Sequence, residues 1–191
     1  MNAYKEINEK YYDPYLNKEG ACALGWGSDA SQLKRFEILL EIPGRKHDDS
    51  ILDVGCGHGD LSKFCSNYTG IDCRKSVIDV AKSRYSNKKF YHCSISDIVD
   101  KYDWVMASGI FAIDHDWKQY VTNELTAMFL TARKGVACNF LSSNEKRIKN
   151  PAMKYASIGE ICDIVQNISE KFTVRHDYFN NDVTVYLYHL Q

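Results

Sequence analysis

The segment 51–61, which reads ILDVGCGHGDL, constrains the fold of this chain more than any other stretch. It begins with a short apolar run, which is typical of a buried parallel strand. The run ends in three glycines spaced two apart, and apolar residues return at helical spacing in Leu61, Phe64 and Cys65. A strand, a glycine turn and a helix in this order gather backbone N–H groups at one point. A nucleotide-like ligand can bind there against bare backbone.

The residues around the glycines distinguish two kinds of cofactor. A dinucleotide-binding turn has the spacing GxGxxG, in which the third glycine serves helix–strand packing. Here the spacing is GxGxG, and Asp53 lies inside the apolar run that precedes it. A carboxylate at this place is costly to bury unless it has a partner. Its charge would repel a pyrophosphate but would attract a ligand that carries an ammonium group.

This segment resembles motif I, DxGxGxG, of the class I (Rossmann-like) S-adenosylmethionine-dependent methyltransferase family. The residues that match the motif are Asp53, Gly55, Gly57 and Gly59. The resemblance, which extends over about residues 50 to 190, implies that these residues bind S-adenosyl-L-methionine as the cofactor. It also implies that S-adenosyl-L-homocysteine is the product. From the residues alone, a glycine-rich turn without a ligand is the alternative.

Strand and helix patterns alternate from residue 51 onward. After the first strand, further strands are predicted at 68–72, 90–93, 102–107, 135–141, 172–178 and 183–189. Helices are predicted at about 74–85, at about 117–132 and after the capping box of Ser157 and Glu160. Repeated βα units predict an α/β fold, a three-layer α-β-α sandwich around a mostly parallel sheet. The last two strands form a hairpin, and the family's seven-stranded sheet has the order 3-2-1-4-5-7-6 with strand 7 antiparallel.

Residues 1–48 precede this alternation, and we expect them to form an N-terminal helical segment that acts as a lid or as a prop for the sheet. Together with the core at 49–191 they would make one domain. A first helix is expected over 4–16, and Ser28 can cap a second helix that runs to about residue 42. The apolar residues in register on this second helix are Leu33, Phe36 and Leu40.

Acidic residues follow the second and third predicted strands, at the sheet edge where α/β proteins bind ligands. Asp72 ends the second strand, where a nucleotide-binding unit places the acid that accepts hydrogen bonds from the ribose hydroxyls. By resemblance to the family, Cys73 packs on adenine, Asp97 takes the adenine amine and Ile98 covers the ring. The residues that the family places near the methionine part are Ser108 and Gly109. The structural alternatives are a helix cap for Asp72 and a loop acid for Asp97.

Other candidate residues have less specific patterns. Arg35, on the second N-terminal helix, can pair with the methionine carboxylate, or it is a solvated helix charge. The candidates for contact with the methyl acceptor are Tyr11, Tyr12, Trp26, His115 and His176. A lone histidine such as His176 is more often structural. We name no catalytic residue, and the basic stretch 146–154 is typical of a solvated loop.

Composition narrows the partners and the location. The chain has 191 residues and a formal net charge of −1, which gives no electrostatic footprint for nucleic acid. No apolar run is long enough to span a membrane, and residues 1–18 are too polar for a signal peptide. The seven cysteines include no CxxC pair. We therefore expect no metal site, and reduced thiols in a cytoplasmic setting.

The sequence predicts an S-adenosylmethionine-dependent methyltransferase acting on a small molecule. After the fourth strand it lacks an NPPY-like run, a Pro-Cys pair and a paired-glutamate loop, which nucleic-acid and protein arginine methyltransferases use. Two alternatives stay open. One is aminopropyl transfer or S-adenosylmethionine cleavage on the same scaffold, and the other is a catalytically inactive, methyltransferase-like binding subunit. Neither the acceptor nor the oligomeric state is set by the sequence.

Overall fold

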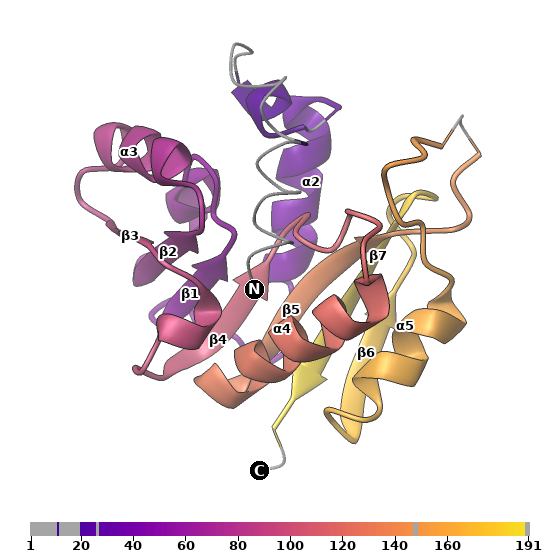
Figure 1. Cartoon of the computed structure of the whole chain (residues 1–191). Helices are drawn as coiled ribbons and strands as arrows, with labels where there is room; N and C mark the ends of the chain where they lie inside the picture. The colour runs from indigo at the N-terminus through magenta and orange to yellow at the C-terminus, as the bar shows by residue number, and fades with distance from the viewer. Residues whose placement is uncertain (1–10, 12–19, 26, 147–148, 190–191) are drawn as a thin grey trace.

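A seven-stranded sheet forms the centre of the computed structural model, which describes residues 11, 20–25, 27–146 and 149–189. The strand order is β3-β2-β1-β4-β5-β7-β6 (Figure 1). The strands are β1 (Ile51–Val54), β2 (Tyr68–Asp72), β3 (Lys89–His92), β4 (Tyr102–Ala107), β5 (Ala132–Leu141), β6 (Lys171–Arg175) and β7 (Asp182–Tyr188). Strand β7 is antiparallel to both of its neighbours, whereas the pairings from β3 through β5 are parallel. This confirms the predicted order and directions.

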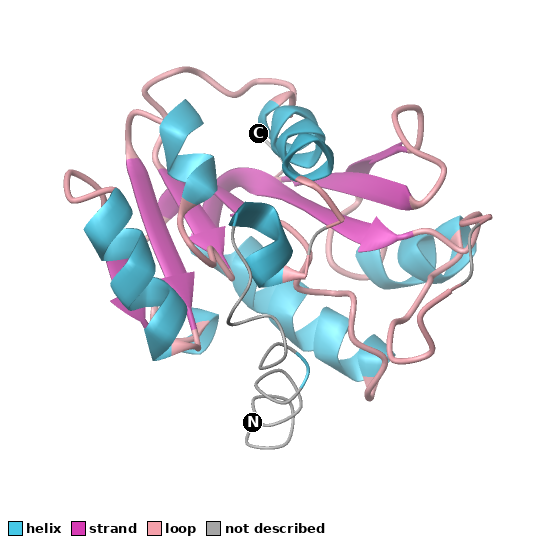
Figure 2. Ribbon diagram, turned by 90° about the horizontal axis from the view of Figure 1, so that it is seen from above, coloured by secondary structure: helices cyan, strands magenta, loops and turns pink. Residues whose placement is uncertain are grey.

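Helices cover both faces of the sheet, as the view from above in Figure 2 shows. The α-helices are α2 (Asp29–Leu40), α3 (Lys75–Arg84), α4 (Trp117–Thr131) and α5 (Ile158–Val165). The short 3-10 helices are η2 (Gly20–Leu24), η3 (Asp60–Phe64) and η4 (Ile95–Asp97). None of the helices in the described part of the chain has the length and apolar character needed to cross a membrane.

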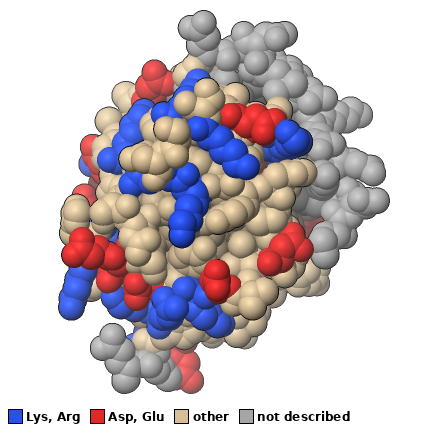
Figure 3. All heavy atoms as spheres, turned by 90° about the vertical axis from the view of Figure 1, so that its left-hand side faces the viewer, with Lys and Arg blue, Asp and Glu red and all other residues tan. Residues whose placement is uncertain are grey.

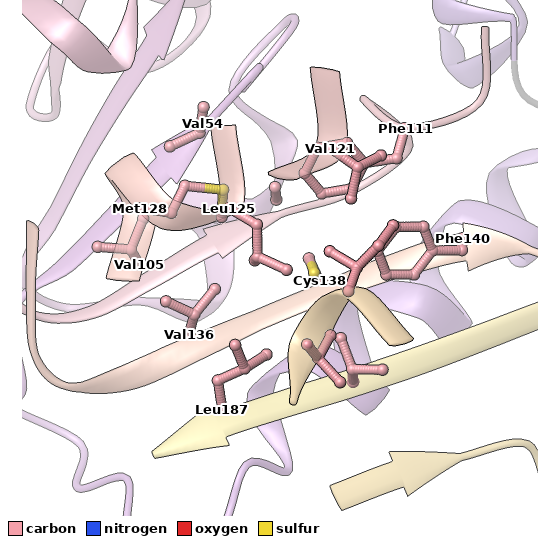
Figure 4. Packing of buried hydrophobic residues seen from close by; sticks show 14 of the residues in the cluster. Val54, Val105, Phe111, Val121, Leu125, Met128, Val136, Cys138, Phe140 and Leu187 are labelled. Carbon is pink, nitrogen blue, oxygen red and sulfur yellow. The ribbon is translucent and has the colours of Figure 1, made fainter. Parts of the chain in front are cut away.

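Two hydrophobic clusters join these layers. One packs α2, η3 and α3 on the first face of the sheet, and the other packs α4 and α5 on the second face. Figure 4 shows the second cluster, in which Leu125 and Met128 of α4 lie over Val105 and Val136. Successive residues of β5 enter opposite clusters, since Val136 belongs to one and Ala137 to the other. This alternation is expected for a strand that is buried on both faces.

Two predicted helix starts are confirmed by their caps. The Ser28 hydroxyl accepts a hydrogen bond from the Ser31 N–H at 3.2 Å and begins α2. At α5, the Ser157 hydroxyl accepts from the Glu160 N–H at 3.2 Å, and the Glu160 carboxylate accepts from the Ser157 N–H at 2.8 Å. Each cap satisfies backbone donors that the first helical turn leaves unpaired.

The structure corrects three expectations about the elements. The glycine turn leads into the 3-10 helix η3 and not into an α-helix, because Cys65 is already extended and β2 begins at Tyr68. Phe64 and Leu33, which we placed at core spacing, are 45% and 41% exposed, whereas Leu39 of α2 is fully buried. Strand β6 ends at Arg175, earlier than predicted. Of the helix expected over 4–16, only Tyr11 lies within the described residues, and it is helical.

Candidate functional site

A cavity of about 920 Å³ lies across the carboxyl ends of the central strands. Its walls come from the glycine turn after β1, the end of β2, η4, the β4–α4 loop, α4, α2 and the start of β7. It therefore reaches from one helical layer to the other over the sheet edge. The predicted site residues that line it are Arg35, Asp53, Gly55, Gly57, Asp72, Cys73, Asp97, Ser108 and Gly109. The predicted residues from different strands thus lie around one cavity.

The three motif glycines divide into two roles. Gly55 and Gly57 line the cavity with φ values of 71° and 53°, which residues with a Cβ rarely adopt. A Cβ on Gly57 would lie 2.7 Å from the Leu24 side chain of η2. Gly59 does not line the cavity, and a Cβ there would lie 2.6 Å from the ring of Phe90. The third glycine is therefore required by packing between η3 and β3, and the structure does not place it at the cavity wall.

Asp53 lies beneath the glycine turn and is only 3% exposed. The partner that such a buried carboxylate requires is Tyr68 of β2, whose hydroxyl donates a hydrogen bond to it at 2.7 Å. Burial raises the pKa of Asp53 to about 7, against the opposing effect of the Tyr68 hydrogen bond. The negative charge of Asp72 makes a smaller contribution in the same direction, which the value of about 7 includes. The site therefore holds an acid that is ready to titrate near neutral pH.

Asp72 connects the glycine turn with the start of α3. One carboxylate oxygen accepts a hydrogen bond from the Gly57 N–H at 3.1 Å, and the other accepts from the Arg74 N–H at 2.9 Å. The Arg74 guanidinium lies 3.6 Å from the second oxygen. Because Arg74 is the N-cap residue of α3, the capping contact that we considered as an alternative is present. The carboxylate also lines the cavity, so the two roles are compatible.

The turn after β3 is organised by a second capping box. The Asp97 carboxylate accepts hydrogen bonds from the Ser94 N–H and hydroxyl, both at 2.8 Å. These bonds lower the pKa of Asp97. Ile98 does not line the cavity and packs against the core cluster instead, while Ile95 lines the cavity. The 3-10 turn of η4 thus presents its first residue, Ile95, to the cavity in place of Ile98.

The end of β4 is held in place by β5. The Gly109 N–H donates to the side-chain oxygen of Asn139 at 2.8 Å, and the Asn139 amide donates to the Ser108 hydroxyl at 3.4 Å. Asn139 is 2% exposed and lines the cavity, but the sequence analysis did not identify it. The signal was a single amide inside the apolar strand segment GVACNFL.

Arg35 is buried at the cavity wall, so the alternative of a solvated helix charge was wrong. Its guanidinium donates to the Asp182 carboxylate of β7 and to the Ser31 backbone oxygen. The Tyr178 hydroxyl donates to the second oxygen of Asp182 at 2.5 Å. Asp182 was not identified from the sequence, and this buried ion pair ties α2 to β7. At least two nitrogens of the Arg35 guanidinium, Nε and Nη1, are thus engaged by other residues of the chain.

None of the three acceptor-site candidates within the described residues lines the cavity. His115 is exposed, with its ring nitrogen 3.8 Å from the Asp116 carboxylate. His176 lies 3.2 Å from the Asn180 backbone oxygen and so has the structural role that we considered as the alternative. Tyr11 accepts a hydrogen bond from the Asn150 amide at 3.4 Å and does not line the cavity. The two remaining candidates, Tyr12 and Trp26, lie outside the described residues.

Helix α4 adds residues that the sequence analysis did not identify. Tyr120, Glu124 and Ala127 recur on one face of the helix and line the cavity. The Glu124 side chain is half-buried, and partial removal of its carboxyl group from water raises its pKa. In the part of the chain that the structure describes, no residue forms a hydrogen bond or ion pair with this carboxyl group.

A family model described as a methyltransferase domain matches residues 45–176 of the chain. The chain therefore belongs to this methyltransferase family, and the predicted family is confirmed. A search of the curated proteins finds none that matches the chain in sequence.

Solved structures of methyltransferases share the fold at low sequence identity. Magnesium protoporphyrin IX methyltransferase from Synechocystis PCC 6803, with bound SAM, is 14% identical, with full coverage of both chains and a TM-score of 0.72. The plantazolicin methyltransferase BpumL, in complex with a monoazolic desmethylPZN analog and SAH, is 14% identical (98% and 95% covered, TM-score 0.70). A SAM-dependent methyltransferase from Thermotoga maritima is 12% identical (97% and 99% covered, TM-score 0.67). The ligands named for the first two agree with the predicted cofactor and product.

Proposed function

We propose that the protein is an S-adenosylmethionine-dependent methyltransferase that acts on a small molecule. The observation that carries the proposal is the arrangement around the glycine turn. Asp53 is buried beneath this turn, and the Asp72 carboxylate accepts a hydrogen bond from Gly57 in its middle. Gly55 and Gly57 line the cavity with backbone alone, and a Cβ at either position would collide with the Ile110 or Leu24 side chain. These features fit a ligand that carries an ammonium group and a ribose. The part of the ligand between these two groups would lie against the glycine backbone.

The proposed roles follow from the positions of the side chains. Asp53 would balance the ammonium charge, and Asp72 would accept hydrogen bonds from the ribose hydroxyls. Ser108 and Gly109, fixed by Asn139, would lie beside the methionine part. When bound, the cofactor supplies an activated methyl group on a sulfonium. The protein then has to align the acceptor with it and exclude water, and alignment can contribute up to about 7–11 kcal/mol to lowering the barrier.

The size of the cavity supports a small acceptor. Its volume of about 920 Å³ is at the upper end of the range for small-molecule sites, which is roughly 300–1,000 Å³. The half between α2 and β7 extends beyond the glycine turn and can receive the acceptor. On the face of the molecule in Figure 3, Lys and Arg side chains are interspersed with Asp and Glu. Such mixed charge does not favour a polyanionic partner.

Two other proposals concern the domain organisation and the location of the protein. We propose that the whole chain works as one domain, since α2 shares a hydrophobic cluster with the strands of the core. We propose a reducing, cytoplasmic setting, which the seven free cysteines support.

An inactive binding subunit is less compatible with the chain because Asp53 and Asp72 still line the cavity. Analysis of the products formed from S-adenosylmethionine would separate methyl transfer from aminopropyl transfer or cleavage.

Calorimetry with three ligands tests the cofactor assignment. We expect S-adenosylmethionine and S-adenosylhomocysteine to bind and NAD not to bind, because the Asp53 and Asp72 charges oppose a pyrophosphate at this turn. Binding of NAD without either S-adenosyl ligand would overturn the assignment.

Asp72→Ala is expected to weaken cofactor binding by about ten- to a hundredfold, because it removes charge-assisted hydrogen bonds to the ribose. Titration calorimetry measures the affinity, and circular dichroism checks that the variant is folded. Asp60→Ala is the control, since Asp60 follows the same glycine turn at the start of η3 but bonds to Tyr85 and Lys63 outside the cavity. Unchanged affinity in a folded Asp72→Ala variant would leave this residue only its capping role.

Deletion of residues 1–26 is expected to weaken cofactor binding while the core stays folded. Leu24 and Gly25 line the cavity, and the Leu24 side chain packs at the glycine turn. A segment that closes over this site would exclude water from the reacting groups. We expect the cofactor to slow proteolysis of the segment, which limited digestion measures. If digestion rates and affinity were both unchanged, the segment would be a prop and not a lid.

A further inference from the structure

Two cysteines occupy neighbouring positions at the cavity, directly after β2 and β3. These strands are parallel neighbours in the sheet (Figure 1), and the last pair in their register joins Asp72 to His92. The next residue of each strand is a cysteine, Cys73 after β2 and Cys93 after β3. Both cysteines line the cavity, and both are half-buried, so neither is sealed off from solvent.

The spacing of these two positions suits a disulfide bond. Neighbouring strands of a sheet are about 4.8 Å apart, and the Cα atoms that a disulfide joins are about 4.4–6.8 Å apart. Hydrogen bonds hold both positions in place beyond the last registered pair. The His92 Nε2–H donates to the Cys73 backbone oxygen at 3.0 Å, which fastens Cys73 to the residue that precedes Cys93. The capping box of Ser94 fixes the chain directly after Cys93.

A third cysteine of the cavity wall, Cys56, is less accessible. It is 8% exposed, and its thiol donates a hydrogen bond to the Gly57 backbone oxygen at 3.8 Å. Burial raises the pKa of Cys56 well above its usual value, so little of it is the reactive thiolate. Partial burial and the charge of Asp97 also raise the pKa of Cys93, but its thiol can be reached from the cavity.

We propose that Cys73 and Cys93 are a redox-sensitive thiol pair, which a small disulfide oxidises to a Cys73–Cys93 bond that weakens cofactor binding. The thiolate of one cysteine first attacks the small disulfide, forms a mixed disulfide and releases one thiolate. The second cysteine then loses its proton to water and attacks the cysteine sulfur of the mixed disulfide, which releases the other thiolate. Two protons and two electrons thus leave the pair, and the small disulfide takes up the electrons. The effect on the cofactor rests on the proposed function.

The bond would change the wall at which the cofactor is proposed to bind. The Cβ atoms of a disulfide are about 3.8 Å apart, so the two strand ends must approach each other by roughly 1 Å. Asp72, the proposed ribose ligand, directly precedes Cys73 and would move with it. A bound cofactor would in turn cover both thiols, because they line the same cavity. Oxidation and cofactor binding therefore oppose each other, and linkage makes this opposition reciprocal.

The test treats the full chain with oxidised glutathione and measures binding of S-adenosylhomocysteine by titration calorimetry. We expect oxidation to weaken binding by about tenfold or more, and dithiothreitol to restore it. Mass spectrometry of unreduced peptides should identify the Cys73–Cys93 bond. Saturating S-adenosylhomocysteine, present during the treatment, should slow the formation of this bond.

Cysteine variants assign the effect to the pair, and each variant is compared with itself before and after oxidation. Cys73→Ser and Cys93→Ser should each stop at the mixed disulfide, because the second thiol is missing. The affinity of the double variant Cys73→Ser/Cys93→Ser should not change on oxidation. Cys162→Ser is the matched control, since Cys162 of α5 is also half-buried but does not line the cavity. This control should lose affinity on oxidation as the wild-type protein does.

Three results would overturn the inference. They are the absence of the Cys73–Cys93 bond in the oxidised, folded protein, a bond that leaves the affinity unchanged, and a loss of affinity that persists in the oxidised double variant. These results leave binding by the reduced protein, and hence the proposed function, intact. Failure of the reduced, folded wild-type protein to bind S-adenosylhomocysteine would instead overturn the proposed function and, with it, the effect on the cofactor. Circular dichroism of each sample separates a loss of binding from a loss of folding.

Discussion

Asp53→Asn is expected to raise the free energy of unfolding at pH 8 by on the order of 2–4 kcal/mol. The Asp53 carboxyl is 3% exposed, and burial raises its pKa from 3.8 to about 7. Above that pH the folded protein therefore holds a buried charge that the unfolded chain would expose to water. Asparagine has no charge, and its side-chain oxygen can still accept the hydrogen bond from Tyr68.

The pH dependence identifies the cause. Between about pH 4 and pH 7 the folded state binds more protons at Asp53 than the unfolded state does, so stability falls as the pH rises through this window. The gain in the free energy of unfolding that Asp53→Asn gives over the wild-type protein should be absent below about pH 4 and reach its full size above about pH 7. Urea denaturation across this range measures it. Tyr68→Phe is the opposing control, because it removes the hydrogen bond to the carboxylate and should lower stability at pH 8. A stability gain of Asp53→Asn that is the same at every pH would contradict this explanation.

The same substitution should impair the proposed function. Ionised Asp53 would attract the ammonium group of the cofactor, and binding of that cation would lower the pKa of the carboxyl. Affinity for S-adenosylmethionine is therefore expected to increase as the pH rises toward 8 in the wild-type protein and not in the asparagine variant. Stability given up for an unfavourable buried charge is typical of a functional site.

The sequence predicted the sheet well because the relevant patterns are local. Strands such as β1 and β4 contain short apolar runs, and the spacing of the glycines marks the turn after β1. The capping serines Ser28 and Ser157 have their partners three residues away, so two helix starts could also be predicted. The η4 turn had a similar signal, since Ser94 and Asp97 have capping-box spacing. Because the sequence analysis did not use that signal, it placed Ile98, and not Ile95, at the cavity.

The remaining site residues depend on contacts that no local pattern carries. Arg35 and its partner Asp182 are 147 positions apart, and neither has a neighbour in sequence that indicates the pairing. Glu124 occupies a helical position that suits a solvated residue equally well, and only the packing of α4 against η4 places it at the cavity. The elements could thus be predicted from periodicity, but the walls of the cavity could not.

The buried ion pair between α2 and β7 leads to a second large effect. Asp182→Ala is expected to destabilise the folded protein by about 3–5 kcal/mol, because it removes the carboxylate partner of a buried guanidinium. The Arg35 and Asp182 side chains are only 4% and 2% exposed, so water cannot replace the lost interaction. The Tyr178 hydroxyl also loses one of its two hydrogen-bond partners, the Asp182 carboxylate at 2.5 Å, and keeps the Thr184 hydroxyl at 2.7 Å. Thermal and urea denaturation measure the loss.

A double variant shows whether the pair contributes net stability or only compensates its own burial. Arg35→Met combined with Asp182→Leu removes both charges and keeps apolar volume at the interface. We expect it to recover most of the stability lost in Asp182→Ala, since well-packed apolar replacements of buried pairs are often neutral or stabilising. As a comparison, Lys34→Met removes a charge of the exposed Lys34–Glu37 pair on the same helix and should have little effect. If the double variant were no more stable than Asp182→Ala, the pair itself would be what holds α2 on β7. Recovery of stability in the double variant would show that folding does not need the ion pair. The position of the two charges at the cavity wall, and not their effect on stability, would then explain why they are there.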